Sequence, residues 1–229
     1  MAARDLSNVK QDVYDYLSRA AYETGYPKKS LMQAAAMEST MGLDDKAFKD
    51  PSSTYYGVMQ SSKMEKELSR IYSSRRSSTG EFEDPTMDRA GDNGMKAAYY
   101  YGAVVKDRVR NTSKWKDYDF DFLAKDLGID DPQLLEYMTW QQGREGTMQI
   151  LSVLDESSSG EFILDEDGEN PRRDKLIDNI STKGREELSS YDDRKLARIW
   201  LQDTKERWED YGREVMQLGK NLQMDYWNR

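Results

Sequence analysis

Neither cysteine nor histidine occurs among the 229 residues of this sequence. Without cysteine there can be no disulfides, thiolate-bound metals or cysteine nucleophiles. Without histidine there can be no serine–histidine catalytic triad and no histidine-ligated zinc. Any catalysis must therefore come from carboxylates, tyrosines, lysines or hydroxyl groups.

Long apolar runs are also missing. No stretch approaches the roughly 20 apolar residues that a membrane-spanning helix needs, and 34% of the residues are charged. The first ten residues are polar and contain no apolar segment typical of a secretory signal. We therefore expect no membrane span and no signal peptide.

Positive charge is in deficit, with a formal net charge of −9. Binding to nucleic acid needs a basic face that neutralises phosphates, so nucleic acid is not expected as the main partner.

Asp165 and Asp167 before Gly168 weakly suggest a calcium loop. The third acidic ligand and the distal glutamate of such a loop are missing, so we reject a calcium site.

The spacing of apolar residues is helical almost throughout, which predicts an all-α fold. The expected helices cover approximately residues 9–25, 27–40, 61–72, 94–109, 131–143, 148–154 and 190–227. Gly42 is the expected stop of the second helix, and Asp131 followed by Pro132 suits a helix start. Gly143 and Gly146 indicate a break.

The composition predicts three regions. Residues 1–155 form the main domain, residues 156–189 an acidic and polar linker, and residues 190–229 a long C-terminal helix for which Ser190 and Asp193 are a plausible capping pair. An apolar seam runs along this last helix through Trp208, Tyr211, Val215, Leu218 and Leu222. The seam either docks on the domain or meets another chain.

Glu38 is the first candidate for chemistry. It follows Leu31, Ala34 and Ala35 at helical spacing, so a carboxylate continues a stripe of small apolar residues at the end of a helix. Apolar neighbours and the helix dipole both disfavour its anion, so we expect a raised pKa, as a proton donor to a glycosidic oxygen requires. The alternative is a glutamate at the edge of an amphipathic helix that points to water.

Three segments then occur in an informative order. Residues 20–39 read AAYETGYPKKSLMQAAAMES, residues 56–60 read YGVMQ, and residues 134–143 read LLEYMTWQQG. Together they resemble the soluble-lytic-transglycosylase family of the lysozyme-like superfamily, in the form found in phage tail and virion proteins. They match its Glu-Ser helix end, its Gly-x-Met-Gln motif and its tyrosine motif. The resemblance covers roughly residues 10–155.

The resemblance implies a lysozyme-like helical domain that degrades peptidoglycan, with Glu38 as the catalytic acid and base. It assigns substrate binding to Ser39, Tyr56, Gly57, Met59, Gln60, Tyr137 and Gln141. A glycine lets the backbone approach a sugar closely, methionine gives an adaptable apolar contact, and glutamine offers a donor and an acceptor for an N-acetyl group.

The implied reaction cleaves the β-1,4 bond between N-acetylmuramic acid and N-acetylglucosamine. Glu38 protonates the leaving oxygen, the acetamido group of the substrate assists, and Glu38 then deprotonates the 6-hydroxyl to close a 1,6-anhydro ring. This scheme needs no metal or organic cofactor.

The sequence departs from the family at Met138, which follows Tyr137 where the family has asparagine; Gln141 or Gln142 would supply the missing amide. One alternative function is a hydrolytic lysozyme, with Asp44, Asp45 or Asp50 as second carboxylate. Another is a structural virion or ejection protein that keeps the fold.

We expect the chain in a virion, or in the host cytoplasm or periplasm at the cell wall. Its expected partners are glycan strands and, through the C-terminal helix, the virion or a second copy.

Overall fold

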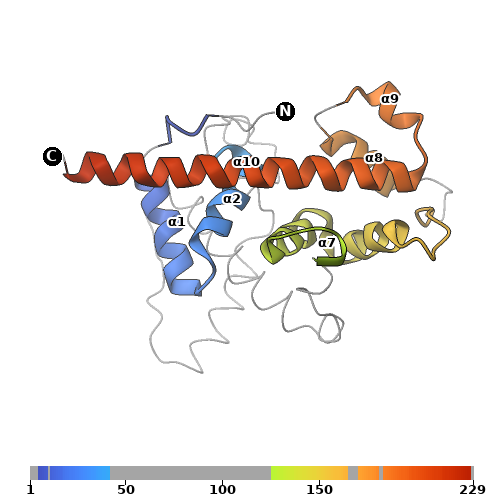
Figure 1. The fold of residues 1–229 in the computed structure, drawn as a ribbon, viewed down its shortest axis with the longest axis horizontal. Coiled ribbons are helices and arrows are strands. Elements are labelled where there is room, and N and C mark those ends of the chain that lie inside the picture. The colour runs from blue at the N-terminus through green and yellow to red at the C-terminus, as the bar shows by residue number, and fades with distance from the viewer. Residues whose placement is uncertain (1–4, 10, 42–124, 165–169, 181–182, 228–229) are drawn as a thin grey trace, which may run out of the picture. The chain divides into compact units, whose positions relative to one another are not determined.

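The computed structural model in Figure 1 describes residues 5–9, 11–41, 125–164, 170–180 and 183–227. Within these ranges the regular structure is helical and contains no strand. The predicted all-α class is therefore confirmed for the described part of the chain. The expected helices at 61–72 and 94–109 lie outside it.

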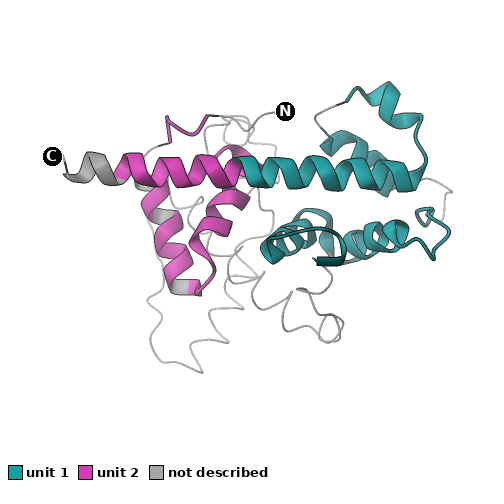
Figure 2. Ribbon diagram, in the orientation of Figure 1, with its two compact units in different colours: residues 1–2, 119–210 teal, residues 3–118, 211–229 magenta. Residues whose placement is uncertain are grey.

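The described helices are α1 (Gln11–Thr24), α2 (Lys28–Ser39), α7 (Pro132–Leu154), α8 (Pro171–Asn179), α9 (Arg185–Ser189) and α10 (Asp193–Trp227). Figure 2 divides the chain into two compact units. Unit 1 comprises residues 1–2 and 119–210, and unit 2 comprises residues 3–118 and 211–229, so α10 contributes to both. None of the described helices is long and apolar enough to cross a membrane.

In unit 2, a tight turn joins α1 to α2. Gly25 takes a left-handed φ of 64°, which ends α1 where the sequence predicted. The Thr24 hydroxyl donates to the Ala20 carbonyl at 2.7 Å and accepts from the Tyr26 N–H at 3.3 Å. Pro27 then stands at the N-cap of α2. The two helices pack together, with the ammonium of Lys28 lying 4.3 Å from the centre of the Tyr14 ring.

The C-terminal part of α10 packs in unit 2 through two glycines seven residues apart. A Cβ on Gly212 would lie 2.8 Å from Gln33 Nε2, and a Cβ on Gly219 would lie 2.9 Å from the Tyr14 hydroxyl. Glycine therefore allows α10 to approach these side chains of α2 and α1 closely. Tyr211, Val215 and Leu218 of the predicted seam are buried.

In unit 1, α7 and the first part of α10 run antiparallel. Arg194 at the start of α10 donates to the Val153 carbonyl at the end of α7, at 3.0 Å. Further along α10, Trp208 reaches the other end of α7, where its indole N–H donates to the Asp131 carboxylate at 2.9 Å. Trp208 is buried, so seam residues in both units are covered by the chain itself.

Two predicted features of α7 are confirmed. Asp131 is its N-cap, accepting from the Gln133 N–H at 3.1 Å, and Pro132 is the first helical residue. Gly143 interrupts the helix with φ 70° and ψ 165°. Asp131 thus both caps α7 and holds Trp208.

Within residues 156–189, where the composition predicted a linker, the structure contains α8 and α9. Their buried side chains are Leu176, Ile177 and Leu188. The predicted capping pair of Ser190 with Asp193 is wrong. Ser190 is the C-cap of α9, and the Asp192 carboxylate accepts from the Lys195 N–H at 2.7 Å at the start of α10.

Candidate functional site

Glu38 lies where a buried helix reaches the surface of its unit. Every residue of α2 from Ser30 to Met37 is buried, which covers the full circumference of two turns. Leu31, Ala34 and Ala35, which share a face with Glu38, are each 0% exposed. Glu38 itself is half-buried and is the only acidic residue of α2. It is therefore partly accessible to solvent at the end of a helix whose preceding two turns are buried.

The backbone directly after Glu38 and Ser39 is unusual. Thr40 has φ 53° and ψ 42°, and Met41 also has φ 53°. These are left-handed conformations, which are uncommon for residues other than glycine and especially for a β-branched one. The helix thus ends before Gly42, the stop that the sequence predicted, because Thr40 takes the left-handed role.

Ser39 is buried with 2% exposure, and its hydroxyl donates to the Ala35 carbonyl at 3.3 Å. The same carbonyl accepts from the Met41 N–H at 3.1 Å. In the described structure, Ser39 therefore contributes to the helix end that carries Glu38.

Tyr137 and Gln141 lie together on α7 in unit 1. The Tyr137 ring is 0% exposed and packs 5.4 Å from the Trp208 ring, centre to centre. The Gln141 side-chain amide donates to the Tyr137 hydroxyl at 3.3 Å. The backbone and side-chain oxygens of the neighbouring Gln142 accept instead from the Arg172 guanidinium, at 3.3 and 3.0 Å.

The other predicted residues are not part of the described structure. Tyr56, Gly57, Met59 and Gln60 lie outside the described ranges, and so do the three candidate second carboxylates, Asp44, Asp45 and Asp50. Of the predicted site, the structure thus places two pairs. Glu38 and Ser39 end α2 in unit 2, and Tyr137 and Gln141 belong to unit 1.

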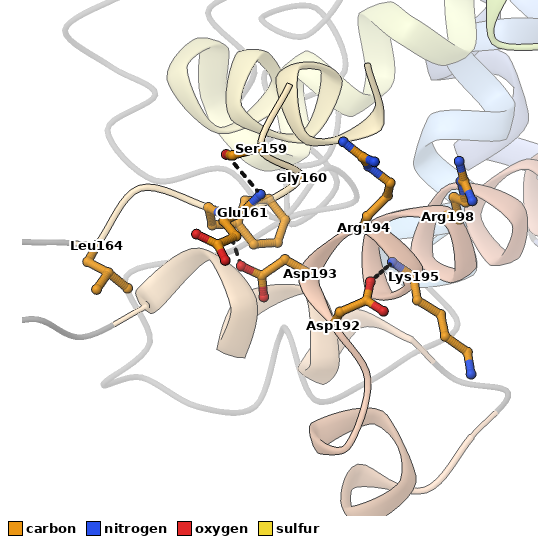
Figure 3. A pocket seen from close by; sticks show the side chains of 10 residues that line it. Ser159, Gly160, Glu161, Leu164, Asp192, Asp193, Arg194, Lys195 and Arg198 are labelled. Atoms are coloured by element: carbon orange, nitrogen blue, oxygen red, sulfur yellow. Dashed lines mark hydrogen bonds between the residues drawn. The ribbon is translucent and has the colours of Figure 1, made fainter. Parts of the chain in front are cut away.

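A pocket of about 800 Å³ lies in unit 1, between the loop 159–164 and the start of α10 (Figure 3). No motif in the sequence indicated it. Its charged lining residues are Glu161, Asp192, Asp193, Arg194, Lys195 and Arg198. Both charge signs are equally present, so the lining favours neither an anion nor a cation by net charge.

Two of these charged residues, Asp193 and Arg194, make several hydrogen bonds within the unit. The Asp193 carboxylate accepts from the Phe162 N–H at 2.9 Å and from the Arg173 guanidinium at 2.5 Å. Arg194 donates to the carbonyls of Val153, Asp155 and Ser158 at 3.0, 3.1 and 2.9 Å. Gly160 has a left-handed φ of 77°, which favours glycine, and a Cβ there would lie 2.8 Å from the Arg194 guanidinium carbon.

The remaining lining residues have contacts of their own. Lys195 lies 3.7 Å from the centre of the Tyr191 ring, and Arg198 is 3.5 Å from the Glu156 carboxylate. Among the described residues, Glu161 alone of the charged lining side chains has no charged or hydrogen-bonded side-chain contact. We therefore interpret the pocket as the joint between α7, its following loop and α10.

No set of three or more acidic side chains within the described ranges is arranged to hold a metal ion. Comparison of the sequence with models of known protein families and with curated proteins, and of the fold with solved structures, found no match.

Proposed function

We propose that this chain is a peptidoglycan lytic transglycosylase that cleaves the β-1,4 bond between N-acetylmuramic acid and N-acetylglucosamine. The observation that carries the proposal is Glu38, the one carboxylate on a buried helix, half-buried at the point where that helix ends. The order of the three sequence segments, with the tyrosine motif last, adds support. The proposed architecture is a lysozyme-like domain in residues 1–155.

In the proposed reaction, Glu38 first acts as a general acid and protonates the glycosidic oxygen. The acetamido group of the muramic acid assists departure of the leaving sugar, an exception to the scheme with two carboxylates. The Glu38 carboxylate then removes the proton of the 6-hydroxyl, whose oxygen attacks C1. The products are a 1,6-anhydro end and a new 4-hydroxyl end, and Glu38 regains its proton.

We further propose that the chain is phage-encoded and carried in the virion to the cell wall. The seam on α10 has four of its five residues buried within a single chain. Association with the virion or a second copy through α10 would therefore use the solvent-exposed face of this helix, where Met216 is 54% exposed.

The first test compares lysis of peptidoglycan by the wild-type protein and Glu38→Gln. We expect a loss of about 10²-fold or more in rate, the usual scale for general acid–base catalysis, with an unchanged circular dichroism spectrum. Glu186→Gln, an exposed glutamate of α9, is the matched control and should retain full activity. Equal lysis by wild type and Glu38→Gln would refute the assignment of Glu38.

The second test identifies the products by mass spectrometry. We expect muropeptides that end in 1,6-anhydro-N-acetylmuramic acid, about 18 Da lighter than reducing ends and resistant to borohydride, because the 6-hydroxyl replaces water. Reducible ends, together with a requirement for Asp44, Asp45 or Asp50, would instead establish a hydrolytic lysozyme. No cleavage by the wild-type protein would favour a structural virion protein.

A further inference from the structure

The end of α2 is held in a conformation that its residues do not prefer. Thr40 and Met41 are consecutive, both have φ 53°, and neither is glycine. A left-handed residue with a side chain is unfavourable because its Cβ approaches the neighbouring carbonyl. Such backbone persists only where the surroundings enforce it, and it concentrates at functional sites.

The surroundings do enforce it here. The Thr40 N–H donates to the Ala36 carbonyl at 2.9 Å, and the Met41 N–H reaches back to the Ala35 carbonyl at 3.1 Å. The Ser39 hydroxyl shares the Ala35 carbonyl at 3.3 Å. Both side chains are buried, with 6% of Thr40 and 1% of Met41 exposed. Hydrogen bonds and burial therefore fix the same two residues.

This arrangement has a consequence for Glu38, the second-last residue of the helix. The last turn of a helix normally frays, because its carbonyls lack intrahelical partners. Here the Ala36 carbonyl, one of these, accepts from the Thr40 N–H, and the Met41 N–H ties the chain back to the Ala35 carbonyl one residue earlier. Unwinding the backbone at Glu38 would therefore break both hydrogen bonds and move the buried Met41.

We infer that Thr40, together with Met41, is a positioning residue that fixes the Glu38 carboxylate; the inference rests on the proposed function. A displaced acid is a poor proton donor, since a misplacement of about 1 Å can cost 10²-fold in rate. Glycine at position 40 would allow the same turn without the steric cost, but also many other conformations. Threonine has fewer accessible backbone conformations than glycine, so a buried Thr40 restricts the end of the helix more than a glycine would.

The test uses Thr40→Gly and Thr40→Asn in the full-length chain. Asparagine is the residue with a side chain that best tolerates the left-handed region, so it serves as the conservative variant. For each protein we would measure kcat and KM on peptidoglycan glycan strands, the melting temperature, and hydrogen exchange of the amides at positions 40 and 41.

For Thr40→Gly we expect faster exchange of both amides and a fall in kcat of about 10-fold, with KM within about twofold of wild type. The melting temperature should fall somewhat, because relief of the strain only partly offsets the loss of the buried Thr40 side chain and the greater freedom of the unfolded chain. The fall in kcat of the folded protein is therefore the decisive readout. Thr40→Asn should restore both kcat and exchange. A merely structural role would lower the melting temperature and leave kcat of the folded protein unchanged.

Two results would overturn the inference. Faster exchange in Thr40→Gly with unaltered kcat would show that the helix end does not position Glu38, and unaltered exchange would show that Thr40 does not hold the helix end. A wild-type protein that fails to cleave peptidoglycan would refute the proposed function and the catalytic consequence together. In that case hydrogen exchange would still decide whether Thr40 holds the helix.

Discussion

Gly146→Ala offers a sharp test of the packing in unit 1. Gly146 lies on α7, and the Nη1, Cζ and Nη2 atoms of the Arg172 guanidinium from α8 occupy the place where its Cβ would be. The same guanidinium donates to the Gln142 side-chain oxygen at 3.0 Å and, more weakly, to the Gln142 carbonyl at 3.3 Å. Burial lowers the pKa of Arg172, while the nearby Glu145 carboxylate raises it.

Two effects of opposite sign decide the outcome. Alanine in place of glycine within a helix stabilises by about 1 kcal/mol. Displacing the guanidinium removes a hydrogen bond from a charged donor, worth about 1.5–3 kcal/mol, and leaves the buried Gln142 oxygen without that donor. The cost of displacing the guanidinium should exceed the gain in helix propensity. We therefore expect the free energy of unfolding to fall by about 1–2 kcal/mol, and the melting temperature by roughly 2–8 °C.

Urea unfolding followed by circular dichroism measures this change. In an Arg172→Met background the obstruction is a flexible apolar chain, so Gly146→Ala should become neutral or stabilising there. Ser152→Ala, at an exposed position of the same helix, reports the gain in helix propensity alone and should stabilise by a few tenths of a kcal/mol. If Gly146→Ala stabilises the wild-type protein as much as Ser152→Ala does, the reasoning is refuted.

Three further predictions use the same measurements. Gly219→Ala should leave the free energy of unfolding nearly unchanged, because its Cβ would meet the Tyr14 hydroxyl; in a Tyr14→Phe background it should stabilise by about 1 kcal/mol. Arg194→Met removes the donor to three carbonyls and should lower the free energy of unfolding by about 2–4 kcal/mol. A fall of less than about 0.5 kcal/mol would contradict the role of Arg194 in holding α10 to the end of α7 and the loop after it. Hydrogen bonds from Lys183 and then Tyr191 lower the pKa of Glu187, so their stabilisation is present at neutral pH and is lost as the pH falls through that lowered pKa. Glu187→Gln should therefore be destabilising at pH 7 and nearly neutral near pH 2, as urea midpoints at the two pH values would show.

The sequence predicted helix boundaries at positions where the type of one or two residues determines the backbone conformation. Asp131 followed by Pro132 supplies a side-chain acceptor and a preset φ, so the start of α7 could be predicted. Gly25 and Gly143 take left-handed φ values of 64° and 70°, and both were predicted as helix boundaries. At these positions the chemistry of one or two residues decides the structure without help from distant parts of the chain.

The short helices α8 and α9 were missed because composition outweighed periodicity. They lie in a polar stretch where only Leu176, Ile177 and Leu188 are buried. Their stability depends on contacts from residues distant in sequence, such as the salt bridge between Arg173 and Asp193 at 2.5 Å. The Asn170–Pro171 pair at the start of α8 was the available signal, since it repeats the N-cap and proline pattern of α7.

In the candidate site, too, some features follow from the local sequence and others depend on packing against distant residues. The position of Glu38 at the end of an apolar stripe could be predicted, because helical spacing alone places Leu31, Ala34 and Ala35 on its face. The left-handed backbone of Thr40 could not, because threonine disfavours this conformation. That conformation depends on the burial of Met41, which is a property of the packed unit and not of the local sequence. The sequence therefore predicts which carboxylate would act, whereas the packing of unit 2 determines how firmly it is held. This is why substitutions at position 40, more than those at position 38, test what the structure adds to the sequence.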